Sequence, residues 1–130
     1  MRKESLHITD DKEYITDTFA FIKTSIFLKN YEIEQVRDKY KARKMPRSYL
    51  DDVLKKEKSD VDVWDELDCI IDVEFIKAKI LTYKFNYKYL EPFIEDMLKW
   101  ELKVKIWWEI LFLINKDNEI IFWLRALDDN

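Results

Sequence analysis

The chain has no glycine among its 130 residues, and this absence restricts the turns and binding loops that it can build. An average protein contains about 7% glycine. Glycine adopts positive φ at little steric cost and lets the backbone approach a ligand closely. Walker loops, dinucleotide-binding turns, nucleophile elbows and kinase phosphate loops all depend on it. The sequence therefore excludes these motifs in their usual form, and we expect Asn to occupy left-handed turn positions.

The remaining composition is that of a chain able to fold. Hydrophobic residues make up 48% of it and include 5 Trp, 7 Tyr and 8 Phe, enough bulky side chains to offset the chain entropy lost on folding. A chain of this length can bury one continuous core. We therefore expect a single domain spanning residues 1–130.

The amino-acid composition indicates the source, and the single cysteine and the short apolar runs indicate the compartment. The depleted residues, glycine and proline, have GC-rich codons, whereas the abundant Lys, Ile and Asn have AT-rich ones, which favours an AT-rich bacterium, a phage, a virus or another mobile element. The chain has one cysteine, Cys69, which suits a reducing compartment. The apolar runs at 110–114 and 120–124 fall short of the roughly 18 residues of a membrane span. We expect a cytoplasmic protein, bacterial or in an infected host, with no membrane partner.

Apolar residues three or four positions apart predict helices in the first part of the chain. The first is expected over residues 10–29 and the second from Asn30 to near Met45, before Pro46. A third, short helix is expected from Ser48. A fourth, capped by Ser59 and Asp62, is expected to continue to Ala78.

Alternating apolar residues predict strands farther along the chain. Residues 81–89 and the segment from Trp100 to Phe112 show this period, and Pro92 suits the first turn of a short helix between them. The polar break at 115–118 before residues 120–127 indicates a hairpin. We expect an α+β fold with about four N-terminal helices followed by a small, largely antiparallel three-stranded sheet. The alternative is an all-α bundle in which 100–127 form two packed helices.

The residues suited to catalysis are few. His7 is the only histidine, so zinc sites with several His ligands and pairs of catalytic histidines are excluded. The Glu101-x-Lys103 spacing, with Asp72 or Asp96 as an added acid, is one that metal-dependent nucleases place on a strand, but Glu and Lys also alternate on any solvated strand. We expect no enzyme activity, no metal and no cofactor, with the nuclease as a remote alternative.

Acidic residues are concentrated between Asp60 and Glu74, where no Lys or Arg occurs. On a helix, Asp65, Asp68 and Asp72 would form one stripe. Like charges repel, so such a stripe favours a basic protein partner. A phage inhibitor or an immunity protein would carry a surface of this kind.

Basic residues are concentrated in 37–58, including Lys41, Arg43, Lys44 and Arg47. A helix, a turn and a second helix with basic side chains would resemble in outline a unit that reads DNA. The whole chain, in contrast, has a net charge of −4. A small DNA- or RNA-binding regulator that uses 37–58 is therefore the alternative to a protein-binding function.

The aromatic residues exceed what one face of a small sheet must bury. Trp107 and Trp123 are the two that we expect to lie outside the core, either in contact with a partner or in a homodimer formed through the sheet. The leading hypothesis is a non-enzymatic protein–protein interaction module that binds through the acidic segment, the aromatic face, or both.

Overall fold

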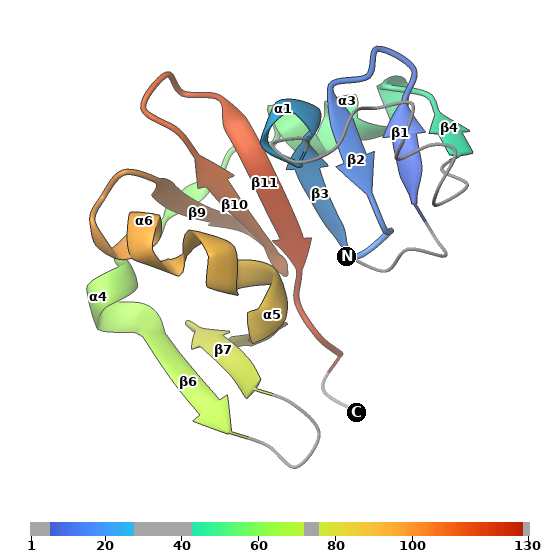
Figure 1. The fold of residues 1–130 in the computed structure, drawn as a ribbon. Helices are drawn as coiled ribbons and strands as arrows, with labels where there is room; N and C mark the ends of the chain where they lie inside the picture. Colours follow the sequence, from blue (N-terminus) through green and yellow to red (C-terminus); the bar gives the residue numbers. More distant parts are fainter. Residues whose placement is uncertain (1–5, 28–42, 72–75, 129–130) are drawn as a thin grey trace. The chain divides into compact units, whose positions relative to one another are not determined.

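The computed structural model describes residues 6–27, 43–71 and 76–128, drawn in Figure 1. The chain divides into two compact units, residues 1–56 and residues 57–130. Each is described below by itself, and the single domain expected from the length stays a prediction.

Unit 1 is built on short strands. They are β1 (His7–Thr9), β2 (Tyr14–Thr16), β3 (Ala20–Lys23) and β4 (Arg43–Met45), followed by the helix α3 (Ser48–Lys55). The strands lie in the order β4-β1-β2-β3. β2 is antiparallel to β1 and to β3, whereas β4 runs parallel to β1. Ile8, Ile15, Ala20 and Leu50 are buried in its core.

The helix expected over residues 10–29 is wrong, and Asp17 gives the physical reason. One carboxylate oxygen of this buried side chain accepts hydrogen bonds from the backbone N–H groups of Phe19 and Ala20, at 3.0 and 2.9 Å. Asp and Thr side chains stabilise turns in this way and compete with helix formation. The chain therefore reverses between β2 and β3, and among residues 10–27, the described part of the expected helix, only α1 (Thr24–Phe27) is helical.

The second expected helix, from Asn30, falls mostly on residues 28–42, outside the described part. Its expected end, Arg43–Met45, is the strand β4. The third helix is present as α3 and begins at Ser48 as expected. The fourth is wrong beyond its first turn, because α4 (Val63–Glu66) is followed directly by the strand β6 (Leu67–Ile71).

Unit 2 contains an antiparallel sheet in the order β11-β10-β9-β5. Its strands are β5 (Ser59–Asp60), β9 (Lys103–Trp107), β10 (Ile110–Ile114) and β11 (Ile120–Arg125). The expected hairpin around residues 115–118 is confirmed, and the two-helix alternative for 100–127 is wrong. β10 and β11 are buried on both faces, including Leu111, Phe112, Phe122 and Leu124.

The second sheet of this unit is an antiparallel meander in the order β6-β7-β8. β7 (Ile76–Ile80) and β8 (Tyr83–Asn86) lead into α5 (Tyr87–Leu90), the 3-10 turn η2 (Glu91–Phe93) and α6 (Ile94–Leu98). Pro92 lies in the first turn of η2, as expected. The rings of Phe93 and Phe122 are 4.8 Å apart, so this helical segment packs on β11 (Figure 1).

The turns use bulky residues where glycine is usual. Positive φ values of 53° to 81° occur at Lys12, Thr18, Leu81, Trp100, Trp108 and Asn118. Asn118 confirms the expectation that Asn replaces glycine in the β10–β11 turn. The others carry a strain of about 1–2 kcal/mol each, because Cβ approaches the following carbonyl oxygen. Strands outnumber helices in the described part of the chain, and the expected fold with four N-terminal helices is wrong.

Candidate binding surface

Trp64 is held in place by its polar atom while most of its ring stays in solvent. It is the second residue of α4, and the Asp62 carboxylate caps the helix by accepting the Trp64 backbone N–H at 3.1 Å. The indole Nε1 donates to the Leu98 carbonyl at the end of α6, at 2.9 Å. The residue is nevertheless 63% exposed. An oriented, exposed Trp binds a partner with little loss of side-chain entropy.

Trp100 lies at the same end of α6, two residues after the carbonyl that holds Trp64. Its backbone N–H donates to the Met97 carbonyl at 3.3 Å, and its φ of 62° turns the chain away from the helix towards β9. Trp100 is 59% exposed. A large apolar side chain at a strained, exposed position stabilises the fold poorly, and strain of this kind is a reason to look for a function.

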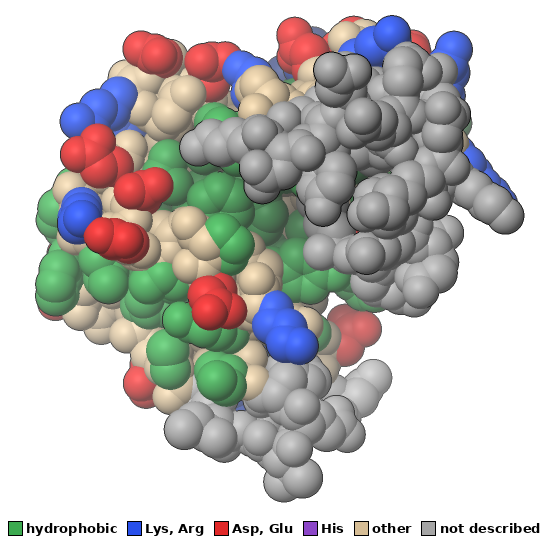
Figure 2. Space-filling model, in the orientation of Figure 1, with side chains coloured by type: hydrophobic (Ala, Val, Ile, Leu, Met, Phe, Trp, Pro, Cys, Tyr) green, Lys and Arg blue, Asp and Glu red, His purple; other side chains and the backbone are tan. Residues whose placement is uncertain are grey.

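The charges around these two residues are mainly negative. The exposed acidic residues on α4, on α6 and just after it are Asp65, Glu66, Glu95, Asp96 and Glu101. Two lysines balance part of this charge: Lys99 contacts Glu95 at 2.6 Å and Lys116 contacts Glu101 at 2.9 Å. The hydrogen bond from Lys99 lowers the pKa of Glu95. In Figure 2, hydrophobic groups lie among acidic ones over α4 and α6, at the left of the view. We call Trp64, Trp100 and these five acids the Trp64 surface.

The expected acidic stripe has a different geometry. Asp65 lies on α4 and Asp68 on β6, and both are exposed. Because the helix ends at Glu66, the two do not share a helical face. Asp72 lies outside the described residues. The predicted stripe assumed one helix across the whole acidic segment, and this assumption is wrong because the strand β6 begins at Leu67.

The tryptophans selected from the sequence differ from those that the structure exposes. Trp123 is only 3% exposed and its ring lies 6.2 Å from that of Phe112, so it presents little surface to a partner. Trp107 is half-buried, with its ring 6.3 Å from that of Trp108. Trp108 is 73% exposed. Sequence reasoning missed Trp100 and Trp108 because they stand at positive-φ turn positions that no Gly, Pro or Asn marks. It missed Trp64 because the expected helix placed this residue on a buried face, whereas α4 ends at Glu66.

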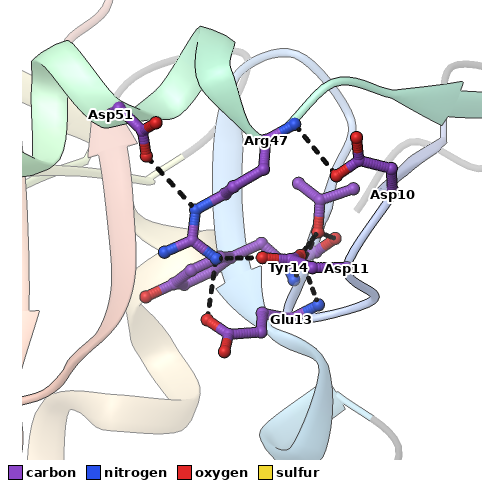
Figure 3. A network of polar contacts seen from close by, with 7 residues as sticks. Asp10, Asp11, Glu13, Tyr14, Arg47 and Asp51 are labelled. Carbon is purple, nitrogen blue, oxygen red and sulfur yellow. Dashed lines mark hydrogen bonds and ion pairs between the residues drawn. The ribbon is translucent and has the colours of Figure 1, made fainter.

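Of the basic residues proposed for nucleic-acid binding, Arg47 is engaged within unit 1. Its Nη1 contacts Asp11 at 2.6 Å and Glu13 at 2.7 Å, and its guanidinium lies 5.0 Å from the Tyr14 ring centre (Figure 3). Its Nε is 3.7 Å from Asp51, an ion pair but too long for a hydrogen bond. The contacts join the start of α3 to the β1–β2 turn. They neutralise the positive charge of Arg47, which we proposed from the sequence for contact with a nucleic acid.

The electrostatics of this cluster are reciprocal. Burial alone would raise the pKa of Asp11, but hydrogen bonds from the Glu13 N–H and the Thr9 hydroxyl, together with the charge of Arg47, lower it overall. Burial likewise opposes the charge on Arg47, and the acids outweigh it and raise the pKa of the guanidinium. Both charged forms are therefore stabilised by folding.

The other basic residues are more open. Arg43 and Lys44 are exposed on β4, whereas Lys41 lies outside the described part. Since Arg43–Met45 is a strand paired with β1, the expected outline of helix, turn and helix is wrong at this point.

Of the residues considered for a nuclease, the structure describes Asp96, Glu101 and Lys103, and the first two belong to the Trp64 surface. Glu101 precedes β9 and pairs with Lys116, while Lys103 donates to the Asn118 side chain at 3.5 Å. Asp96 uses its backbone carbonyl to accept from the N–H groups of Glu101 and Leu102. Within the described ranges, no group of three His, Cys, Asp or Glu side chains could hold a metal ion. Asp72 is not among the described residues.

No protein-family model, no curated protein and no solved structure matches the chain. In residues 6–27, 43–71 and 76–128, no helix is long and apolar enough to cross a membrane.

Proposed function

We propose that this protein is a binding module that engages a basic partner protein through the Trp64 surface. The observation that carries the proposal is the exposure of Trp64 although its indole is fixed by the Leu98 carbonyl. Trp is the residue type most enriched among those that dominate binding energy at protein interfaces. The surrounding acids favour a positively charged partner, because complementary charge speeds encounter and excludes acidic competitors.

The role that fits such a surface is inhibition or sequestration of a basic protein, such as a nuclease or another nucleic-acid-binding protein. An acidic surface with rigid aromatic anchors competes with nucleic acid for the same basic site. We infer a non-enzymatic function of the immunity or anti-defence type, in the cytoplasm of an AT-rich bacterium or a cell infected by its phage. Nucleic-acid binding through 37–58 is less favoured, because acidic side chains neutralise Arg47.

The test compares variants in capture from a lysate of the source or host cell, followed by titration with the purified captured protein. Trp64→Ala and Trp100→Ala should each weaken the affinity about 30-fold, the effect of losing about 2 kcal/mol at an anchor. Trp108→Ala is the matched control, since it removes another exposed Trp of the same unit.

The captured protein should be basic, and its association should slow as salt is added. Equal capture by Trp64→Ala and wild type would refute the proposed surface. A loss confined to Trp108→Ala would move the contact to the β9–β10 turn beside Trp107, and retention of nucleic acid alone would favour the 37–58 alternative.

A further inference from the structure

The meander of unit 2 has an open edge at β6, directly after the helix that carries Trp64. Among the described strands, β6 pairs with β7 alone, with Cys69 opposite Ala78 and Asp68 opposite Lys79. β8 forms the other edge, where the Lys84 carbonyl accepts the Leu127 N–H at 2.8 Å. Figure 1 shows β6 at the outside of this sheet. An edge of this kind is a template for an added strand.

The pairing register fixes which backbone groups of β6 face outwards. The Lys84 carbonyl points away from β7, because it accepts from Leu127. In an antiparallel ladder the backbone N–H and C=O groups of successive residues point to alternate sides of the strand. Lys79, the β7 partner of Lys84, therefore directs its backbone groups towards β6, where they bond the backbone of Asp68. The backbone N–H and C=O of Cys69 then point away from β7, towards the open edge of the sheet.

A side-chain contact agrees with this register. The Cys69 N–H donates to the carboxylate of Asp68, its own neighbour, at 2.9 Å and in an exposed position. The N–H of Leu67, two residues earlier, is taken by the Val63 carbonyl. The Asp68 carboxylate therefore accepts the outward N–H of Cys69 and must release it when another strand pairs with Cys69.

The core-facing side of β6 is also incompletely covered. Cys69 lies on the face shared by Ala78, Ile80 and Phe85, which are all fully buried. Cys69 itself is exposed. The cover over Ala78 and Phe85 on this face therefore does not extend to Cys69.

We propose that the basic partner of the Trp64 surface contributes an extended segment that pairs with β6, its backbone bonded to Cys69 and a Lys or Arg placed beside Asp68. The inference rests on the proposed function and names its mode of recognition. Alternation across the added strand sets its sequence: apolar residues continue the Ala78–Cys69 row, and one basic residue lies directly beside Asp68, in a row that also contains Lys79 and Lys84. An acidic residue beside Asp68 would be repelled.

The probe is a library of random peptides displayed on phage and selected on the immobilised full-length protein under reducing conditions. Enriched peptides should alternate apolar and polar residues, with a Lys or Arg at the polar position beside Asp68. A selected peptide is then synthesised with N-methyl groups on every second backbone nitrogen, in both registers. One register should lose at least about tenfold in affinity, because it lacks the hydrogen bonds to Cys69, while the other should bind as before.

On the protein, Cys69→Pro removes only an outward N–H, which edge strands tolerate, and Cys69→Val keeps it. The proline variant should bind the peptide at least about tenfold more weakly and the valine variant normally. Thermal unfolding checks that both variants fold, and the N-methyl series gives the answer without any variant.

The failures are distinguishable. If neither N-methyl register nor Cys69→Pro matters while Trp64→Ala abolishes peptide binding, strand addition is wrong and the proposed function stands. If Trp64→Ala and Trp100→Ala bind the captured partner protein with wild-type affinity, the proposed surface is wrong, whatever the peptide experiments show for β6. If the wild type sediments as a dimer and Cys69→Pro as a monomer, the occupant is a second copy of this chain, and the basic partner strand is wrong.

Discussion

Arg47→Met tests whether the cluster in Figure 3 holds unit 1 together. Met keeps the apolar stem of Arg and removes its charge. The side chain of Arg47 is 26% exposed, and those of Asp11 and Glu13 are 37% and 54% exposed. Solvent therefore screens the two short ion pairs, and we assign each at most about 1 kcal/mol. The contact with Tyr14 adds about 0.5 kcal/mol, so the expected loss is at most about 2.5 kcal/mol.

The assay follows the two units separately in urea. Every tryptophan lies in residues 57–130, so tryptophan fluorescence reports unit 2, whereas hydrogen exchange of peptides from residues 6–27 and 43–56 reports unit 1. Arg47→Met should lower the protection of unit 1, while the control Arg43→Met, on the exposed strand β4, should stay within about 0.5 kcal/mol of wild type. Equal protection in the two variants would refute the role assigned to Arg47.

Three further outcomes are expected from the same structure. The pKa of Asp11 is lowered from 3.8, so its contribution to stability is full above that pH and is lost as the pH falls through the lowered value. The difference in the free energy of unfolding between wild type and Arg47→Met, measured in urea, should therefore shrink as the pH falls through this range, and a constant difference would contradict the role of Asp11. Asp17→Ala should destabilise unit 1 by about 2 kcal/mol, since the buried N–H of Ala20 and the part-buried N–H of Phe19 lose their acceptor, whereas unchanged hydrogen exchange at Phe19 and Ala20 would contradict the turn. Trp123→Ala should cost about 3–5 kcal/mol in urea unfolding followed by circular dichroism, and a loss below about 1 kcal/mol would show that Trp123 lies outside the core.

The second half of the chain was more predictable than the first, for local reasons. Pro92 fixes a helical start, and the polar run at 115–118 with Asn118 at positive φ marks a turn. Strict alternation at Val104 and Ile106 placed β9. The single strand expected from Trp100 to Phe112 is nevertheless broken at Trp108, whose φ of 53° no residue type announces.

The first half misled because its apolar spacing suits a helix while its turns are made by side chains. The spacing of Ile15, Phe19 and Ile22 is helical, yet Thr16 and Asp17 reverse the chain through hydrogen bonds to backbone groups. Local pattern carries no information on such tertiary pairing. In the acidic segment Asp62 caps the helix as expected, whereas Ser59 lies in the strand β5 and takes no part in the cap. After Glu66 the strand pairing of β6 with β7 outweighed the helical spacing.

The candidate surface was predictable in charge but not in shape. The excess of acids after Asp60 in the sequence indicates a basic partner, and Asp65 belongs to the Trp64 surface. Which tryptophans are exposed was not predictable, because Trp100 and Trp108 stand in positive-φ turns and the orientation of Trp64 depends on its hydrogen bond to Leu98, far away in the sequence.

The most direct test of the central claim is the dissociation constant of the purified captured partner for the double variant Trp64→Ala/Trp100→Ala, measured by calorimetry beside Trp108→Ala. The account predicts a loss of at least about 100-fold for the double variant, as expected for two anchor residues, and an unchanged value for the control. A double variant within about threefold of wild type, the scatter of an ordinary surface substitution, would contradict the Trp64 surface as the binding site.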